Sequence, residues 1–138
     1  MMHARNRAAQ YGVVRSHGLV ADASPTRLVQ IMFEQILSQL ATAQGCMQRI
    51  KNNMPLNEVT LKLAAMRKAI LLIGQLNQTL DMERGGKIAE NLRALYEYML
   101  VRLTVANANN DTAIVEEVSR LVRDVKIGWD GIVTDAGR

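Results

Sequence analysis

The chain has 138 residues, of which 49% are hydrophobic and 22% are charged, and its formal net charge is +4. This length fits one domain with a sizeable core, and no apolar run approaches the roughly 18 residues that a membrane-spanning helix needs. The first 23 residues carry Arg5, Arg7 and Arg15 against one acid, Asp22. In the remainder, bases and acids are interleaved along the helices without a dense Lys/Arg stripe, which argues against a nucleic-acid-binding surface. We therefore expect a single domain that inserts into no membrane and binds no nucleic acid.

The first 23 residues lack a sustained hydrophobic repeat. We expect them to form a tail that is flexible or loosely docked on the rest of the domain. No apolar stretch follows the basic start of this segment, so a secretory signal is not expected. The single cysteine, Cys46, cannot form an internal disulfide and is expected to be a small buried hydrophobe. Its presence suits a reducing cytoplasm.

A first helix is predicted from Ser24, a good N-cap, and Pro25, which fits the first helical position. Its apolar residues recur with alternating spacings of four and three, as in a helix that packs in a bundle. This seam consists of Val29, Phe33, Ile36, Leu40, Ala43, Met47 and Ile50. The helix is expected to end near Asn52 and Asn53, before Pro55.

A second helix is predicted to start near Asn57 and to follow the same spacing. Its seam consists of Val59, Leu63, Met66, Ile70, Ile73 and Leu80, with Asn77 at the remaining seam position. Gly74 lies inside this helix and costs about 1 kcal/mol relative to alanine. A close helix–helix approach, a docking groove or a tolerated imperfection would each account for it.

A third helix is predicted from about Lys87 to Ala106, after a turn at Gly85 and Gly86. One face of this helix carries Ile88, Leu92, Met99 and Ala106, with Leu95 and Tyr96 on either side of its middle turn. A second face carries Asn91, Leu95, Tyr98 and Arg102. One stripe is enough to join a bundle, so the second suggests a surface that receives another chain. The alternative is a wide face that points entirely into the core.

A fourth helix is predicted to open at Asp111, a natural cap. It carries Ile114, Val118, Leu121, Val125 and Ile132, and beside them a line of Val115, Val122 and Trp129. Short connections make consecutive helices antiparallel neighbours. The sequence therefore predicts an all-α fold, an antiparallel up-down-up-down four-helix bundle over residues 24–133. The N-terminal tail, residues 1–23, would be able to dock on it, and residues 134–138 would form a C-terminal tail.

The chain lacks the residue patterns of an enzyme. Its two histidines, His3 and His17, both lie in the N-terminal tail and have no metal-ligand partner at helical spacing. There is no nucleophile–base constellation, and Gly85-Gly86 lacks the further glycine and lysine of a phosphate-binding loop. We expect no catalysis, no metal and no cofactor.

The run from Leu80 to Met99, LDMERGGKIAENLRALYEYM, resembles the signature of the FliS family of flagellar export chaperones. Three further matches follow in consistent order. They are Tyr11 with Val13 and the run from Ala23 to Leu28, the run from Arg102 to Asp111, and Glu117-Val118 followed by Trp129. The chain departs from the family at Phe33-Glu34-Gln35, where a Tyr-Asp-Gly run is frequent. The resemblance covers about residues 11 to 130.

The resemblance implies a cytoplasmic chaperone that binds the C-terminal segment of flagellin one-to-one. It would prevent premature polymerisation and deliver flagellin to the flagellar export gate. The family assigns Tyr11 to a segment that covers part of the cargo surface. From spacing, the groove candidates are Asn91, Leu95 and Tyr98, together with Val122 and Trp129 on the last helix. Ordinary bundle packing is the alternative for each of them.

A competing hypothesis is a regulatory or structural bundle that self-associates. The second stripes would then form a homodimer interface, because a cargo groove and a dimer seam have the same composition.

Overall fold

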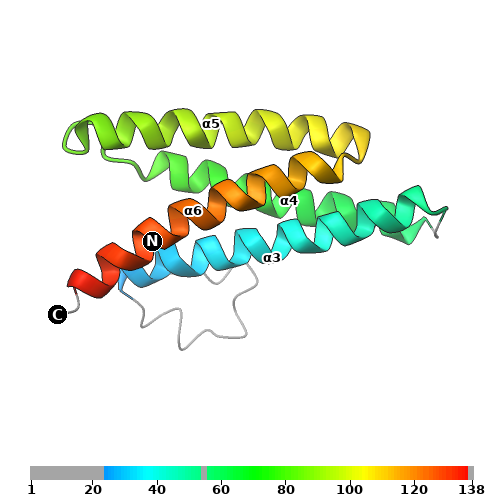
Figure 1. Cartoon of the computed structure of the whole chain (residues 1–138), viewed down its shortest axis with the longest axis horizontal. Helices are drawn as coiled ribbons and strands as arrows, with labels where there is room; N and C mark the ends of the chain where they lie inside the picture. The colour runs from blue at the N-terminus through cyan, green and yellow to red at the C-terminus, as the bar shows by residue number, and fades with distance from the viewer. Residues whose placement is uncertain (1–23, 54–55, 137–138) are drawn as a thin grey trace, which may run out of the picture.

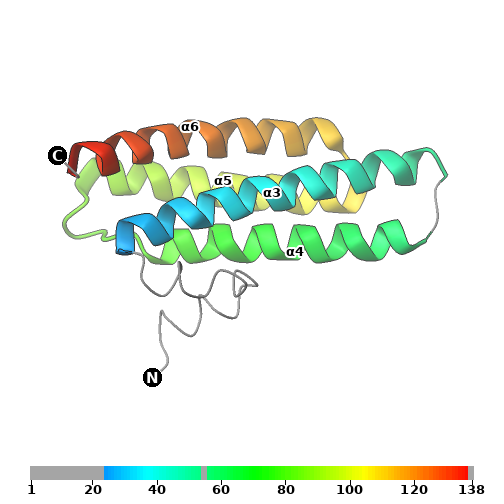
Figure 2. The same cartoon turned by 90° about the horizontal axis from the view of Figure 1, so that it is seen from below.

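The computed structural model describes residues 24–53 and 56–136, and this part of the chain forms four α-helices. They are α3 (Pro25–Lys51), α4 (Asn57–Gln78), α5 (Gly86–Asn109) and α6 (Thr112–Ala136). α3 packs against α4 and α6, and α5 packs against the same two helices. Consecutive helices run in opposite directions along one long axis (Figures 1 and 2). The predicted all-α four-helix bundle is confirmed, and α6 continues to Ala136, three residues beyond the expected end of the bundle.

The helix starts predicted from the capping residues Ser24 and Asp111 are found in the structure. The Ser24 hydroxyl accepts a hydrogen bond from the Arg27 amide at 3.1 Å, and Pro25 occupies the first helical position. Asp111 caps α6, because its Oδ1 accepts the amides of Ala113 at 3.1 Å and Ile114 at 3.2 Å. The N-terminal tail, including Tyr11, lies outside the described residues.

The turn between α4 and α5 needs both of its glycines. Gly86 has a φ of 53°, in the left-handed region that favours glycine. A Cβ on Gly85 would lie 2.7 Å from the Asp81 carbonyl oxygen and 2.5 Å from the Ala89 Cβ. Any side chain at position 85 would therefore force the turn apart.

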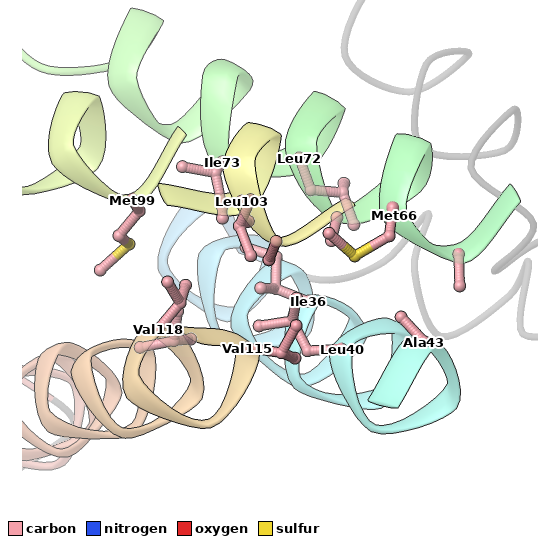
Figure 3. Close-up of a cluster of buried hydrophobic side chains, with 14 of the residues drawn as sticks. Ile36, Leu40, Ala43, Met66, Leu72, Ile73, Met99, Leu103, Val115 and Val118 are labelled. Carbon is pink, nitrogen blue, oxygen red and sulfur yellow. The ribbon is translucent and has the colours of Figure 1, made fainter. Parts of the chain in front are cut away.

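The core follows the middle of the bundle, and all four helices contribute to it (Figure 3). Five of the seven predicted seam positions of α3 are buried, and Val29 and Ile50 are half-buried. Cys46 is buried, as predicted. The other central side chains include Met66, Ile73, Met99, Leu103, Val115 and Val118.

The predicted seam of α4 is partly wrong. Val59 and Leu63 are 36% and 44% exposed, and Ile70 is half-buried. The buried face is rotated from the predicted seam and consists of Lys62, Ala65, Met66, Ala69, Leu72, Ile73 and Leu76. Ala65 and Ala69 let α4 approach its neighbours closely, so Val59 and Leu63 lie at the edge of the contact, while Met66 and Ile73 of the predicted seam stay at its centre.

The rotation of α4 also buries a lysine. Lys62 Nζ donates to the Asn107 carbonyl oxygen at 2.8 Å and to Asn110 Oδ1 at 2.9 Å. Asn107 lies in the last turn of α5, where the helix dipole favours a positive charge. Desolvation lowers the pKa of Lys62 from its usual value. This side chain therefore ties α4 to the turn between α5 and α6.

Candidate partner-binding cleft

A cleft of about 540 Å³ opens at the end of the bundle where α3 and α5 begin and α4 and α6 end. In Figure 1, α5 and α6 separate progressively from their shared turn toward this end. All four helices and the α4–α5 connection contribute to the lining. The lining residues are Pro25, Thr26, Val29, Phe33, Leu76, Thr79, Leu80, Asp81, Ile88, Leu92, Tyr96, Asp124, Val125, Gly128, Trp129 and Ile132.

The cleft has a buried inner part and an exposed mouth. Phe33, Leu76 and Tyr96 are all less than 5% exposed, and burial raises the pKa of Tyr96 to about 12. The Tyr96 phenol is therefore neutral at physiological pH. By contrast, Ile88 is 73% exposed and Ile132 is 59% exposed. An apolar depression flanked by exposed isoleucines is the kind of surface that marks a binding site.

The sequence placed Ile88 and Ile132 on core-facing stripes, and that prediction is wrong for both. Ile88 lies in the first turn of α5 and Ile132 lies near the end of α6, at the end of the bundle where these two helices have separated. No neighbouring helix is close enough there to cover them. Apolar residues at this helical spacing are buried in the core in the middle of a helix. At the helix ends beside the cleft, residues with the same spacing are exposed at its mouth.

Of the predicted site residues that the structure describes, Trp129 alone lines the cleft. Its indole Nε1 donates to the Thr26 carbonyl oxygen at 3.0 Å, which ties α6 to the start of α3. Next to it, Asp130 accepts from Gln30 at 2.7 Å and from Lys126 at 2.6 Å. The hydrogen bond from Lys126, and then that from Gln30, lower the pKa of Asp130. The hydrogen bond from Trp129 to Thr26 holds the indole at the wall of the cleft, and the bonds of Asp130 add contacts between α6 and α3 and within α6.

Asn91, Leu95 and Tyr98 lie on α5 outside the cleft lining. Asn91 is exposed and Leu95 is half-buried against the core. The Tyr98 hydroxyl donates to Glu117 Oε2 at 2.6 Å, and Arg102 Nε donates to Glu117 Oε1 at 3.2 Å. The second stripe of α5 thus contributes polar contacts to α6.

This cluster perturbs the titration of its members. The hydrogen bond to Glu117 raises the pKa of Tyr98, and the hydrogen bonds from Tyr98 and then Arg102 lower the pKa of Glu117. The shifts follow from hydrogen bonds that favour the carboxylate and the neutral phenol.

Val122 is 1% exposed and packs in the core. The cleft-lining valine of α6 is Val125, which is half-buried. Sequence reasoning also missed Phe33, Leu92 and Tyr96 as cleft residues, because it treated them as seam positions only. Gly128 was the available signal: a glycine inside an amphipathic helix, beside Trp129, marks a position where bulk is absent.

A metal-binding cluster and a membrane-spanning helix are both absent from the described residues. Within residues 24–53 and 56–136, no group of three or more His, Cys, Asp or Glu side chains could hold a metal ion. In the same part of the chain, no helix is long and apolar enough to cross a membrane.

The fold and the cleft define a small all-α bundle with an open apolar cleft between the ends of its helices. A family model described as "Flagellar protein FliS" matches residues 7–136. The chain therefore belongs to the FliS family, which is a family of chaperones rather than enzymes.

Individual relatives agree with this assignment. The Pseudomonas aeruginosa flagellar secretion chaperone FliSB is 44% identical over 131 residues, which are 95% of this chain and 98% of the relative. The flagellar secretion chaperone FliS of Salmonella typhimurium is 34% identical over 95% of this chain and 93% of its own length. Escherichia coli FliS is 36% identical over 93% of this chain and 90% of its own length.

Proposed function

We propose that this protein is a cytoplasmic export chaperone that holds the C-terminal segment of flagellin in the cleft. Bound one-to-one, it prevents premature polymerisation and delivers flagellin to the flagellar type III export apparatus. The observation that carries the proposal is the open apolar cleft with Ile88 and Ile132 exposed at its mouth. Family membership supplies the flagellar context.

The physical mode is helix-in-groove recognition coupled to ordering of the cargo. An amphipathic cargo segment would cover the exposed isoleucines and extend the core, as a fifth helix at the open end of the bundle. Part of the gain from burying apolar surface is offset by the entropy lost when the segment orders. Such binding needs no nucleotide, because the cargo can pass directly to the export machinery.

The N-terminal tail enters the proposal as a displaceable cover that carries Tyr11. The support is positional: the described chain begins at Ser24, and Pro25 and Thr26 already line the cleft. A segment of 23 residues attached there has ample length to reach the mouth of the cleft.

Flagellin capture by two matched variants tests the proposal. Ile88→Asp and Val101→Asp each place a carboxylate at an exposed position of α5, 73% and 64% exposed respectively, so neither should prevent folding. Ile88 lines the cleft and Val101 does not. We expect Ile88→Asp to weaken flagellin binding by about tenfold or more, because a bound segment would bury an unpaired charge there. Val101→Asp should bind as the unmodified protein does.

Equal binding by all three proteins would overturn the cleft assignment. Loss of binding in Val101→Asp alone would move the site to the outer face of α5. Light scattering on the protein without flagellin tests the self-association alternative. A stable homodimer that Ile88→Asp dissociates, together with no flagellin capture, would favour that alternative.

A further inference from the structure

The charged side chains in the described lining of the cleft are of one sign. Within residues 24–53 and 56–136, the charged residues that line the cleft are Asp81 and Asp124, with no Lys, Arg or His among them, although the whole chain carries a net charge of +4. The cleft therefore presents negative charge beside its apolar surface.

The two carboxylates differ in what they already bind. Asp81 Oδ1 accepts the amides of Glu83 at 3.2 Å and Arg84 at 3.0 Å, and its other oxygen lies 3.9 Å from Arg84 Nε. Asp81 therefore organises the connection between α4 and α5. Asp124 is exposed on α6 and has no hydrogen-bond or ion-pair partner among the described residues.

The cations near Asp124 on the same helix are engaged elsewhere. Arg120 and Arg123 lie 3.9 Å and 3.1 Å from Glu116 Oε1. Lys126 Nζ lies 2.6 Å from Asp130 Oδ2. Glu117, the remaining carboxylate beside them, binds Tyr98 and Arg102 across the contact with α5. Among the α6 carboxylates whose side chains are described, Asp124 alone stands unpaired.

Asp124 also lies on the face of α6 that lines the cleft. It lies one helical turn before Gly128 and two turns before Ile132, so the three share a face of α6, and all three line the cleft. No atom lies within 4 Å of the position that a Cβ on Gly128 would occupy. An occupant can therefore approach the α6 backbone at Gly128, which brings its neighbouring side chains within reach of Asp124.

We propose that the cleft selects an amphipathic segment whose apolar face is flanked by a Lys or Arg, and that Asp124 is the ionic partner of that cation. The inference rests on the proposed function, since it names the chemistry of the segment that the same cleft accepts. Burial of apolar surface provides the affinity. The ion pair with Asp124 fixes the register of the bound segment along the cleft and excludes segments that carry an acidic residue in place of the cation.

The test measures affinity of the full-length protein for a synthetic peptide of the flagellin C-terminal segment, at several salt concentrations. Asp124→Asn should raise Kd by about 2- to 5-fold, as expected for a partly exposed ion pair, and should flatten the salt dependence. Asp124→Lys should raise Kd by about tenfold or more. Glu90→Gln and Glu90→Lys are the matched controls, because Glu90 is exposed on α5 and does not line the cleft.

A second arm identifies the cation. Each Lys or Arg of the peptide is replaced in turn by Glu, and one of these peptides should bind the Asp124→Lys variant better than it binds the unmodified protein. If Asp124→Asn binds with unchanged Kd and salt dependence, the inference is wrong while the proposed function stands. Equal losses in Asp124→Lys and Glu90→Lys would reduce the effect to net charge and also overturn it. Failure of the unmodified protein to bind the peptide would overturn the proposed function itself.

Discussion

Substitutions at Gly128 should affect the stability of the bundle and its proposed binding of flagellin in different ways. It lies inside α6, its φ is not in the left-handed region, and a Cβ placed on it would contact nothing within 4 Å. The same holds for Gly74 inside α4, which does not line the cleft. Helical glycine costs about 0.5–1 kcal/mol relative to alanine. Gly128→Ala and Gly74→Ala should therefore each stabilise the free protein by that amount.

Larger side chains at positions 128 and 74 should have different effects on flagellin affinity. Gly128→Leu places a branched side chain where the cargo would approach α6, and misfit of this kind costs about 1–3 kcal/mol. We expect the Kd for flagellin to rise by about 5- to 150-fold, while Gly74→Leu leaves it unchanged. Urea denaturation followed by circular dichroism gives the stabilities, and isothermal titration calorimetry with flagellin gives the affinities. Unchanged affinity in a correctly folded Gly128→Leu variant would refute the placement of cargo in the cleft.

Three further predictions concern other parts of the chain. Lys62→Ala should lower the free energy of unfolding by about 1–3 kcal/mol, because the acceptors on Asn107 and Asn110 lose their donor. Lys62→Met should lower the free energy of unfolding by less than Lys62→Ala does. Equal losses of stability for the two variants in urea denaturation would contradict this prediction. Tyr98→Phe should raise the Glu117 pKa toward its ordinary value, as NMR titration can measure. Since that pKa is depressed in the folded state, Glu117 stabilises the fold above its unfolded pKa and the contribution is lost as pH falls through the folded value, so the variant should lose less stability on acidification. Deleting residues 1–18 should increase hydrophobic-dye binding or self-association at unchanged helicity; no change in either would contradict a covering role for Tyr11.

The sequence predicts the bundle well where a side chain's role is decided locally. Ser24 and Asp111 cap their helices as predicted, and the Gly85-Gly86 turn requires glycine for reasons of backbone geometry. The α3 seam is buried because α3 packs against two neighbours along its length.

The rotation of α4 was not predictable from periodicity. The predicted seam and the observed buried face share Met66 and Ile73. Whether the large residues Val59 and Leu63 or the small residues Ala65 and Ala69 are buried beside them depends on how closely the neighbouring helices approach. The cleft has the same origin. Whether Ile88 and Ile132 are core or surface depends on the divergence of α5 from α6, and no local pattern encodes that angle.

The most direct test of the central claim compares intact flagellin with flagellin that lacks its C-terminal segment. Each is mixed with the unmodified protein, and the molar mass of the mixture is measured by size-exclusion chromatography with light scattering. We predict a one-to-one complex with intact flagellin and no complex with the truncated form. Equal binding of both forms would contradict the proposed site on flagellin, and binding of neither would contradict the chaperone–cargo assignment.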